Sequence, residues 1–599
     1  MKELTILTLG LFLASIIDYV NTACAQINLE KCSCDHPTSR KYFIYCQDRG
    51  LTAMPPRINR SLSDGEASGD FSMNAITSIP GNYFENMKYF EILDFSSNKI
   101  SSIGADSLKQ LDNSLASLYM RNNKIKSIAP NTFAGMTRLN TLDLSGNSIS
   151  SPCGIKTKDV TDYSLAANGI TRLNDNCFPD SVKVVKLNLS RNRISHIGRK
   201  AFDGLTAMEE LDLGYNSLSD FSDGILSLID LSSVHTLSLR GNDFQYLESI
   251  CGHRLPNLKS LDLGHNNLVD LQKYCFNIYF TGGDNTDITL NFEHNFIPSL
   301  AGSTFLGLDK RLVRLLLNNN RITEIDVSTF TKLTRLTYLN LNHNSITSLE
   351  FLRDWQDNDL LELSLANNQI HTLLPGVFLN LDKLTKLNLD SNYLLYIESN
   401  AFSGMSSLSD LSIEYNLMTN LADGAFAGLS RLQKLKVTGN GLVTLKNCTF
   451  ANLDNLVQFH FDDNLLHCDC DLMWLLPFMN RVNNDGISSG VEEPVLEDKC
   501  HYPLTSTGLI MANQVSGNCR DSHVTTNACV GLEVQFGEPI EDEMNITWSY
   551  DPQSPGKVEQ ITLTQLDIES NTLMAEEDVT EKAMPITLQD VKDDKIYKV

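Results

Sequence analysis

An asparagine recurs along most of this chain, usually every 24 residues, within the pattern Leu-x-Leu-x-x-Asn-x-Leu, where isoleucine often takes the last place. Clear examples are residues 142–149, 187–194 and 339–346. A fixed period of about 20–50 residues is the sequence signature of a solenoid, in which each repeat forms one coil. The repeat asparagines, which predict seventeen coils over residues 57–466, are Asn74, Asn98, Asn123, Asn147, Asn168, Asn192, Asn216, Asn242, Asn266, Asn295, Asn320, Asn344, Asn368, Asn392, Asn416, Asn440 and Asn464.

Each residue type in the repeat has a structural role. The alternating leucines place every second side chain of a strand inside the coil. The asparagine can bond backbone groups left unpaired where the chain turns. No coil buries its apolar face alone, so stacked neighbours must supply the core. Ten residues after many of the asparagines stands a phenylalanine, which we expect to fill the far side of the coil: Phe84, Phe202, Phe378, Phe402, Phe426 and Phe450.

The 24-residue period with its phenylalanines resembles the typical class of extracellular leucine-rich repeats. That class includes Toll-type ectodomains, chaoptin-like adhesion proteins, Slit modules and the acid-labile subunit, which is similar in overall plan. The resemblance covers residues 24–520. It implies an α/β solenoid, a leucine-rich-repeat horseshoe with a parallel concave β-sheet and a disulfide-stabilised cap at each end. It says little about the ligand, because such folds host many partners.

Cysteines flank the repeats on both sides, where an open solenoid needs caps. The four before the first repeat resemble a cysteine-rich N-terminal cap over residues 24–56, although the first spacer is longer than usual: Cys24, Cys32, Cys34 and Cys46. The segment after the last repeat resembles a C-terminal cap over residues 467–520. This resemblance implies the disulfides Cys468–Cys500 and Cys470–Cys519. Zinc binding is the alternative for the Cys-x-Cys pairs, and an exported chain argues against it.

Six further cysteines lie elsewhere in the chain. Cys251 and Cys275 each stand nine residues after their asparagine. Equivalent positions on adjacent coils can approach the Cα separation of about 4.4–6.8 Å that a disulfide needs. Cys153 and Cys177 also fall on neighbouring coils, at unequal offsets, and we expect them to pair as well. Two cysteines remain, which could be free, pair with each other or, for the second, join another chain: Cys448 and Cys529.

The N-terminus has the pattern of a secretory signal peptide. Lys2 precedes an apolar run over residues 4–17, and small residues follow as far as Ala25. The run is too short for a comfortable membrane span. The best Ala-x-Ala site would place cleavage after Ala25 and discard Cys24. We favour cleavage just before Cys24, which keeps this cysteine for the cap and assigns residues 1–23 to the signal peptide. No later stretch is long and apolar enough to span, so we expect a secreted protein without membrane insertion, whose cysteines form disulfides.

Composition and motifs narrow the function. Acidic residues outnumber basic ones 73 to 48, for a net charge of −25, which argues against a nucleic-acid partner. The sequence carries no G-x-S-x-G elbow, H-E-x-x-H helix or phosphate-binding loop, so we expect neither an enzyme nor a cofactor or metal. Residues 521–599 lack the repeat and are rich in acid. Two short alternating stretches there could be strands, but we expect a largely disordered acidic tail.

Binding residues are expected on the concave sheet, four and two places before each asparagine. The N-terminal half presents acids there, among them Asp94, Asp143, Asp212 and Asp262. This row suggests a charge-graded docking surface. The alternative is the ordinary polarity of a solvated strand face. Further along, the predicted face is mixed or basic, with Tyr338, Lys386, Lys434, Lys436 and His460.

A second candidate is the position immediately before the asparagine, which holds Tyr215, His265, His294 and His343. Nearby histidines could sense pH between about 5 and 8 or contact a partner. The alternative is incidental surface, because Asn319 interrupts the stripe. The 29-residue spacing from Asn266 to Asn295 predicts an exposed, glycine-rich loop at 277–287, which is either a binding loop or neutral growth.

Four Asn-x-Ser/Thr sites predict N-glycosylation, at Asn59, Asn188, Asn447 and Asn545. Asn188 falls on a concave strand, where a glycan would cover part of the inner face. These features favour an extracellular protein-binding protein with an adhesion, carrier or receptor-like role. The alternative is a structural matrix or assembly component, including a non-catalytic subunit of a secreted enzyme. The partner would be an extracellular protein.

Overall fold

The computed structural model describes residues 31–466, with gaps at 39–40, 57–65, 86, 88, 130, 180, 220–232, 248–256, 272–275, 277–286 and 451–452. Beyond residue 466 it describes Leu475, Phe478, Val482 and six strands between residues 532 and 598. Outside the described residues lie the predicted signal peptide, Cys24, the proposed pairs Cys251–Cys275, Cys468–Cys500 and Cys470–Cys519, Cys529, Asn59 and most of the 277–287 loop.

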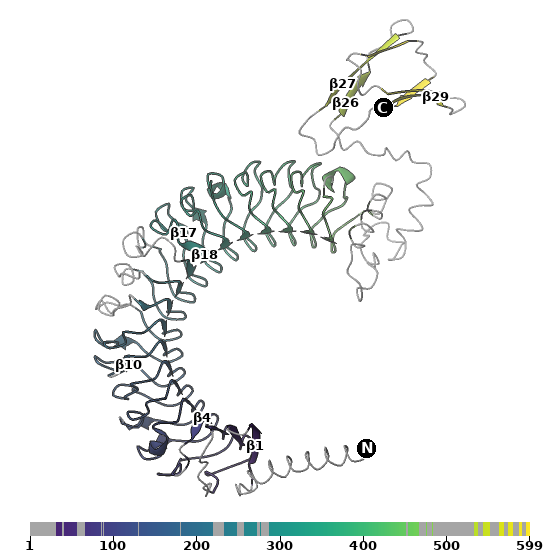
Figure 1. The fold of residues 1–599 in the computed structure, drawn as a ribbon. Helices are drawn as coiled ribbons and strands as arrows, with labels where there is room; N and C mark the ends of the chain where they lie inside the picture. The colour runs from purple at the N-terminus through teal and green to yellow at the C-terminus, as the bar shows by residue number, and fades with distance from the viewer. Residues whose placement is uncertain are drawn as a thin grey trace, which may run out of the picture. The chain divides into compact units, whose positions relative to one another are not determined.

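The chain divides into two compact units, residues 1–321 and 322–599. The first begins with an antiparallel hairpin, β1 (Ser33–Thr38) and β2 (Lys41–Tyr45), and β2 pairs in parallel with β3. Parallel strands then follow side by side along the inner side of this unit's coils (Figure 1). They are β3 (Glu66–Asp70), β4 (Phe90–Asp94), β6 (Ser117–Tyr119), β8 (Thr141–Asp143), β9 (Asp162–Ser164), β11 (Lys186–Asn188), β13 (Glu210–Asp212), β14 (Thr236–Ser238), β15 (Ser260–Asp262), β16 (Ile288–Asn291) and β18 (Leu312–Leu316).

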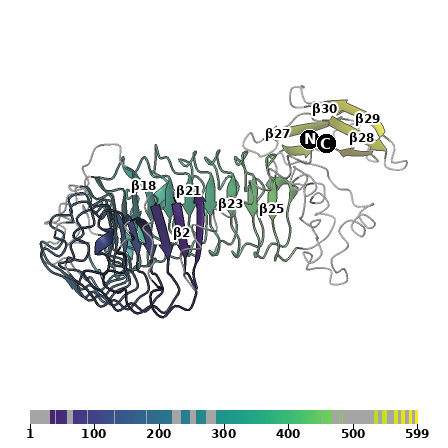
Figure 2. The ribbon, with the colours of Figure 1, turned by 60° about the horizontal axis from the view of Figure 1, so that its bottom comes forward.

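The second unit continues the same architecture, and Figure 2 shows its strands β21, β23 and β25 running in parallel. Its solenoid strands are β20 (Tyr338–Asn340), β21 (Glu362–Ser364), β22 (Lys386–Asn388), β23 (Asp410–Ser412), β24 (Lys434–Lys436) and β25 (Gln458–His460). Each of the seventeen strands from β3 to β25 named here ends four residues before a repeat asparagine. The predicted leucine-rich-repeat solenoid with a parallel sheet is therefore confirmed.

The outer segments of the described coils are short. Two pairs of two-residue strands run in parallel in the first unit, β5 (Ser102–Ile103) with β7 (Ser127–Ile128) and β10 (Arg172–Leu173) with β12 (His196–Ile197). Similar strands are β17 (Ser299–Leu300) in the first unit and β19 (Glu324–Ile325) in the second. The remaining outer elements are the 3-10 helices η1 (Lys109–Leu111), η3 (Glu350–Leu352) and η4 (Asn447–Phe450).

The repeat asparagines hold adjacent coils together, as their polarity predicted. Asn98 is buried, and its Nδ2 donates to the carbonyl of Phe95 at 3.0 Å and to that of Phe71, on the preceding coil, at 2.8 Å. Its Oδ1 accepts the amide N–H of Ile76 at 2.9 Å. The same bonds recur at Asn192, Asn266 and Asn392. Each amide thus satisfies backbone groups that would otherwise be buried without a partner.

The phenylalanines form the predicted spine inside the coils. All six lie buried in the core. Successive rings stack in parallel: those of Phe378 and Phe402 lie 5.9 Å apart and those of Phe402 and Phe426 lie 6.0 Å apart. Offset stacking of this kind stabilises neighbouring coils beyond the burial of apolar area.

Two disulfides join described residues of the first unit. Cys32 bonds Cys46 at the start of the solenoid, and Cys153 bonds Cys177 between neighbouring coils. Cys34 and Cys448 are also disulfide-bonded. Among the cysteines that the structure describes, none is free.

Residues 521–599, expected to be a largely disordered acidic tail, contain six strands in the structure. One antiparallel sheet has the order β26 (Leu532–Phe536), β27 (Glu543–Tyr550) and β30 (Ile586–Gln589). The other has the order β29 (Leu573–Asp578), β28 (Thr562–Asp567) and β31 (Lys595–Lys598). Alternation of apolar and polar residues, visible in Leu532–Phe536, suits a strand and outweighs the acidic composition there. In the described part of the whole chain, no helix is long and apolar enough to cross a membrane.

Candidate binding surface

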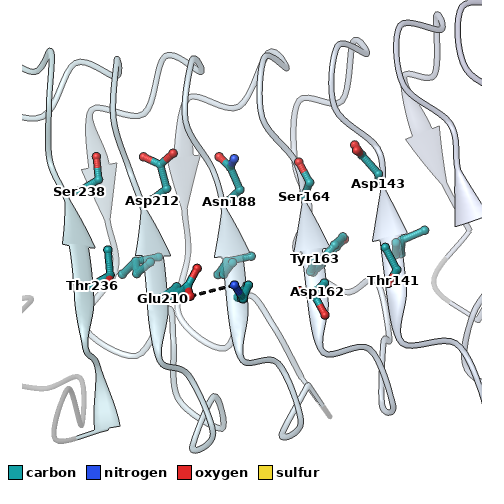
Figure 3. A pocket seen from close by; sticks show the side chains of 14 residues that line it. Thr141, Asp143, Asp162, Tyr163, Ser164, Asn188, Glu210, Asp212, Thr236 and Ser238 are labelled. Carbon is teal, nitrogen blue, oxygen red and sulfur yellow. Dashed lines mark ion pairs between the residues drawn. The ribbon is translucent and has the colours of Figure 1, made fainter. Parts of the chain in front are cut away.

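The inner strands present two rows of side chains away from the core. In β13, for example, Glu210 and Asp212 are half-buried on the inner face, while Leu211 between them is buried in the core. The rows lie four and six residues before each asparagine, as Figure 3 shows for strands β8 to β14. The sequence predicted rows four and two residues before the asparagine, yet three of the residues named with them lie six residues before it, in this second row: Tyr338, Lys386 and Lys434. The same alternation along the strand places that row on the inner face.

A hollow of about 450 Å³ lies on the inner face of the first unit, across β8, β9, β11, β13 and β14. We call it the inner-face hollow. Its lining includes four carboxylates and one basic side chain: Asp143, Asp162, Glu210, Asp212 and Lys186. Small polar residues occupy the other outward positions, so the strands leave open space between the charges (Figure 3).

Two of the four carboxylates have a basic partner. Lys186 Nζ lies 2.9 Å from Glu210 Oε1, and the hydrogen bond and charge of Glu210 raise the pKa of Lys186. Arg121 Nε lies 3.2 Å from Asp143 Oδ2. The basic partner of each pair is about half exposed, so the pairs contribute little to stability. They do, however, decide which charges remain available on this face.

The other two carboxylates accept only hydrogen bonds from their own segments. Asp212 Oδ1 accepts the amide N–H of Gly214 at 2.8 Å, and Asp162 Oδ2 accepts the hydroxyl of Thr161 at 2.8 Å. Within the described residues, neither carboxylate is in an ion pair. Asp162 was not named from the sequence because it lies six residues before Asn168, outside the positions four and two places before the asparagine.

Asn188 lies in the middle of the inner-face hollow, on β11. Its Oδ1 accepts hydrogen bonds from the amide and the hydroxyl of Ser190, at 2.9 and 2.7 Å. The amide nitrogen that a glycan would modify is therefore not used in this turn. Of the other predicted glycosylation sites, Asn447 is exposed at the start of η4, and Asn545 lies in β27.

Arg240 lies at the carboxyl ends of the inner strands of the first unit. Four of the predicted residues surround it there: Tyr215, Asp262, His265 and His294. Arg240 Nε donates to the Tyr215 hydroxyl at 3.1 Å, and its guanidinium pairs with Asp262, at 3.5 Å, and with Glu293. The rings of His265 and His294 stack with centroids 4.0 Å apart. Burial, and then the charges of Arg240 and His294, lower the pKa of His265. The spacing of the repeats predicted that the two histidines lie on nearby coils, but it gave no indication of Arg240 or Glu293.

The backbone conformation explains why the residues immediately before the repeat asparagines lie in a regular row. Tyr215, His265, His294 and His343 all have φ between 52° and 54°, in the left-handed region. Glycine fills the equivalent place at Gly241, where φ is 66°. The turn out of the strand thus sets the side-chain direction at this position. His343 lies in the second unit.

The second unit has a smaller hollow of about 230 Å³ across β20 to β24, with Tyr338, Lys386 and Lys436 among its lining residues. Lys386 Nζ lies 2.9 Å from Glu362, and Lys436 Nζ lies 3.6 Å from Glu414. Burial raises the pKa of Asp390, which also lines this hollow. Lys434 is on β24, outside the lining. The charge here is mixed, and most of the predicted lysines are paired.

Among the residues that the structure describes, no group of three or more histidine, cysteine, aspartate or glutamate side chains could hold a metal ion.

Comparison with known proteins supports the fold. A leucine-rich-repeat model matches residues 113–149, 162–218, 310–352, 382–442 and 406–466, and a second matches 86–109 and 254–270. A chain in the structure of the Toll–Spatzle complex, a hub in Drosophila development and innate immunity, is similar with a TM-score of 0.61 and 17% identity. That likeness covers 82% of this chain and 76% of the other, and it shows the fold alone.

Curated relatives share parts of the solenoid. Leucine-rich repeats and immunoglobulin-like domains protein 1 of Homo sapiens is 36% identical over 28% of this chain and 14% of its own length. Leucine-rich repeat-containing G-protein coupled receptor 5 of Xenopus tropicalis is 28% identical over 33% of this chain and 21% of its own. Keratocan of Mus musculus is 27% identical over 53% of this chain and 82% of its own. This chain thus matches only a small part of the length of the first two relatives. By its fold, it is a leucine-rich-repeat protein.

Proposed function

We propose that this chain is an extracellular recognition protein that binds a partner protein on its inner strands, in an adhesion, carrier or receptor-like role. The inner-face hollow is the observation that carries the proposal. It offers polar side chains from five adjacent strands on one rigid surface. Such a surface suits a macromolecular partner because its side chains are held by the sheet before binding, which reduces the entropy lost on association.

The extracellular setting is part of the same proposal. A leader-like N-terminus and the disulfides Cys32–Cys46 and Cys153–Cys177 suit an oxidising compartment. The charged groups of the inner face accept hydrogen bonds from turn amides or form ion pairs with each other. This arrangement suits binding and not catalysis. We therefore propose a binding role without chemistry.

Amine-reactive cross-linking followed by mass spectrometry, in the extracellular fluid that contains the native protein, tests the proposal. We expect one dominant partner joined to the inner-strand lysines, which are Lys186, Lys386, Lys434 and Lys436. The exposed lysines outside the strands serve as the internal control, among them Lys200 and Lys332.

Two outcomes would contradict this function. Cross-links from the partner mainly to the lysines outside the strands would move recognition away from the inner face. Cross-links mainly to other copies of the chain, or to matrix components, would favour the alternative of a structural assembly protein.

A further inference from the structure

We infer that the inner-face hollow takes an extended segment of a partner protein that carries two basic residues four positions apart. This inference rests on the proposed function and names the chemistry of the partner at that site. It depends on the charge left over on the inner strands, on their spacing and on the open space between them.

Asp162 and Asp212 are the carboxylates of the inner-face hollow that form no ion pair with a described residue, although the charge of Asp162 also acts on Lys186 on the adjacent strand. Lys186 is held by Glu210, and Asp143 is matched by Arg121, so these groups are largely compensated within the chain. Asp162 and Asp212 accept hydrogen bonds from neutral groups, and no described basic side chain forms an ion pair with either. A partner supplying one lysine or arginine to each carboxylate would complete both. Charge complementarity of this kind steers association and fixes register.

The strand geometry sets the spacing of those basic residues. Asp162 is on β9 and Asp212 on β13, with β11 between them. They also belong to different rows, two residues apart along the strand direction. With strands about 4.8 Å apart and residues rising about 3.3 Å, the two positions are separated by about 12 Å. In an extended partner, residues four apart lie on the same face and about 13 Å from each other, which fits this separation.

Apart from the paired Lys186 and Glu210, the side chains around the two carboxylates are small and polar and leave room for a backbone. Ser164 and Asn188 separate Asp143 from Asp212 in one row, and Thr141 and Thr236 flank the other (Figure 3). A volume of about 450 Å³ is within the range of ligand-binding clefts. The separation of the carboxylates is too large for one small cation to bridge them, so the match is to a peptide segment.

Asn188 controls access to this site because it lies between the two carboxylates. A glycan on its Nδ2 would project from β11 into the hollow and exclude the segment. We therefore expect the site to be open only in chains that are unmodified at Asn188. Asn188→Ser provides such a chain, since serine occupies the equivalent place at Ser164 and Ser238.

The test measures fluorescence anisotropy of a labelled peptide, Thr-Lys-Thr-Val-Thr-Lys-Thr, with full-length wild type and Asn188→Ser. A peptide with glutamate in place of both lysines is the control ligand. We expect Asn188→Ser to bind the lysine peptide and not the glutamate peptide, and wild type to bind in proportion to its unmodified fraction. In the Asn188→Ser background, Asp162→Asn with Asp212→Asn should weaken binding about tenfold, since two charge-assisted contacts are lost.

A matched pair of exposed aspartates outside the inner strands, Asp106→Asn with Asp203→Asn, changes the net charge equally and should leave the affinity unchanged. Equal binding of both peptides, or equal loss in the two double variants, would overturn the inference. Absence of peptide binding, while a partner still cross-links to the inner-strand lysines, would overturn it and leave the proposed function standing. Loss of both would remove the proposed function as well.

Discussion

Replacing Tyr163 by phenylalanine should make the protein more stable. Tyr163 stands at the centre of β9, is 2% exposed and meets Phe178 edge-on with ring centroids 6.4 Å apart. Within the described residues its hydroxyl has no hydrogen-bond partner. A buried hydroxyl without a partner costs about 1–3 kcal/mol, so Tyr163→Phe should raise the free energy of unfolding by about that amount while keeping the ring packing.

Tyr83 offers the matched control. It is also buried, but its hydroxyl donates to the carbonyl of Pro55 at 3.0 Å. Tyr83→Phe removes that bond and should destabilise the protein by about 1 kcal/mol. Hydrogen exchange of the β9 and β11 amides in increasing urea measures the local change in stability that Tyr163→Phe causes. A local measurement is appropriate because a solenoid need not unfold in one step.

Alkaline pH supplies a second readout. Burial raises the pKa of Tyr163, so the folded state keeps its proton where the unfolded chain, with a tyrosine pKa of about 10, loses it. The stability contributed by the protonated phenol is therefore fully present below about pH 10 and falls above it, by at most about 1.4 kcal/mol per pH unit. Tyr163→Phe should lack this loss. A variant that is less stable than wild type, with an unchanged alkaline profile, would refute the reasoning.

Three further predictions follow from the same contacts. Asn266→Ala removes bonds to three carbonyls and one amide, at 3.0 to 3.2 Å, and should cost about 3 kcal/mol in urea unfolding; a cost below about 1 kcal/mol would contradict the role of the asparagine ladder. Replacing Cys153 and Cys177 by alanine should cost about 2–4 kcal/mol in thermal unfolding, and unchanged stability would argue against that disulfide. The lowered pKa of His265 means that its contribution to stability is present above about pH 6.5 and is lost as the pH falls below it. His294→Asn should raise that pKa in an NMR titration, and an unmoved pKa would show that the stacked ring does not repel the charge.

The solenoid could be predicted from the sequence because its rules are local. Apolar alternation and the recurring asparagine set the position of each strand relative to its own repeat, and each described solenoid strand ends four residues before its asparagine. The same rules placed Asp143 and Asp212 on the inner face. They did not identify Asp162, because it lies six residues before Asn168 and the prediction considered positions four and two before each asparagine.

Side-chain contacts that cross repeats of irregular length could not be predicted from the sequence. Arg240 reaches Glu293 across a repeat of unusual length, so no fixed spacing links them. The C-terminal strands β26 to β31 pair in antiparallel sheets and not through the repeat. Their alternation was visible, but β27 pairs with β30 at Glu543 and Gln589, a separation that no repeat period specifies. Long-range antiparallel pairing is set by the whole fold and not by the local pattern.

The central claim is that a partner protein binds on the inner strands. The most direct test is the affinity of the cross-linked partner for variants that carry a tryptophan on the inner face. Ser164→Trp would fill the inner-face hollow of the first unit, and Lys386→Trp would fill the smaller hollow of the second. Ser148→Trp, at an exposed position outside the strands, is the control. The account predicts that at least one inner-face variant binds about tenfold more weakly or worse, since lost complementarity of about 1.4 kcal/mol has that effect, while the control binds as wild type does. Unchanged affinity in both inner-face variants would contradict recognition on the inner strands.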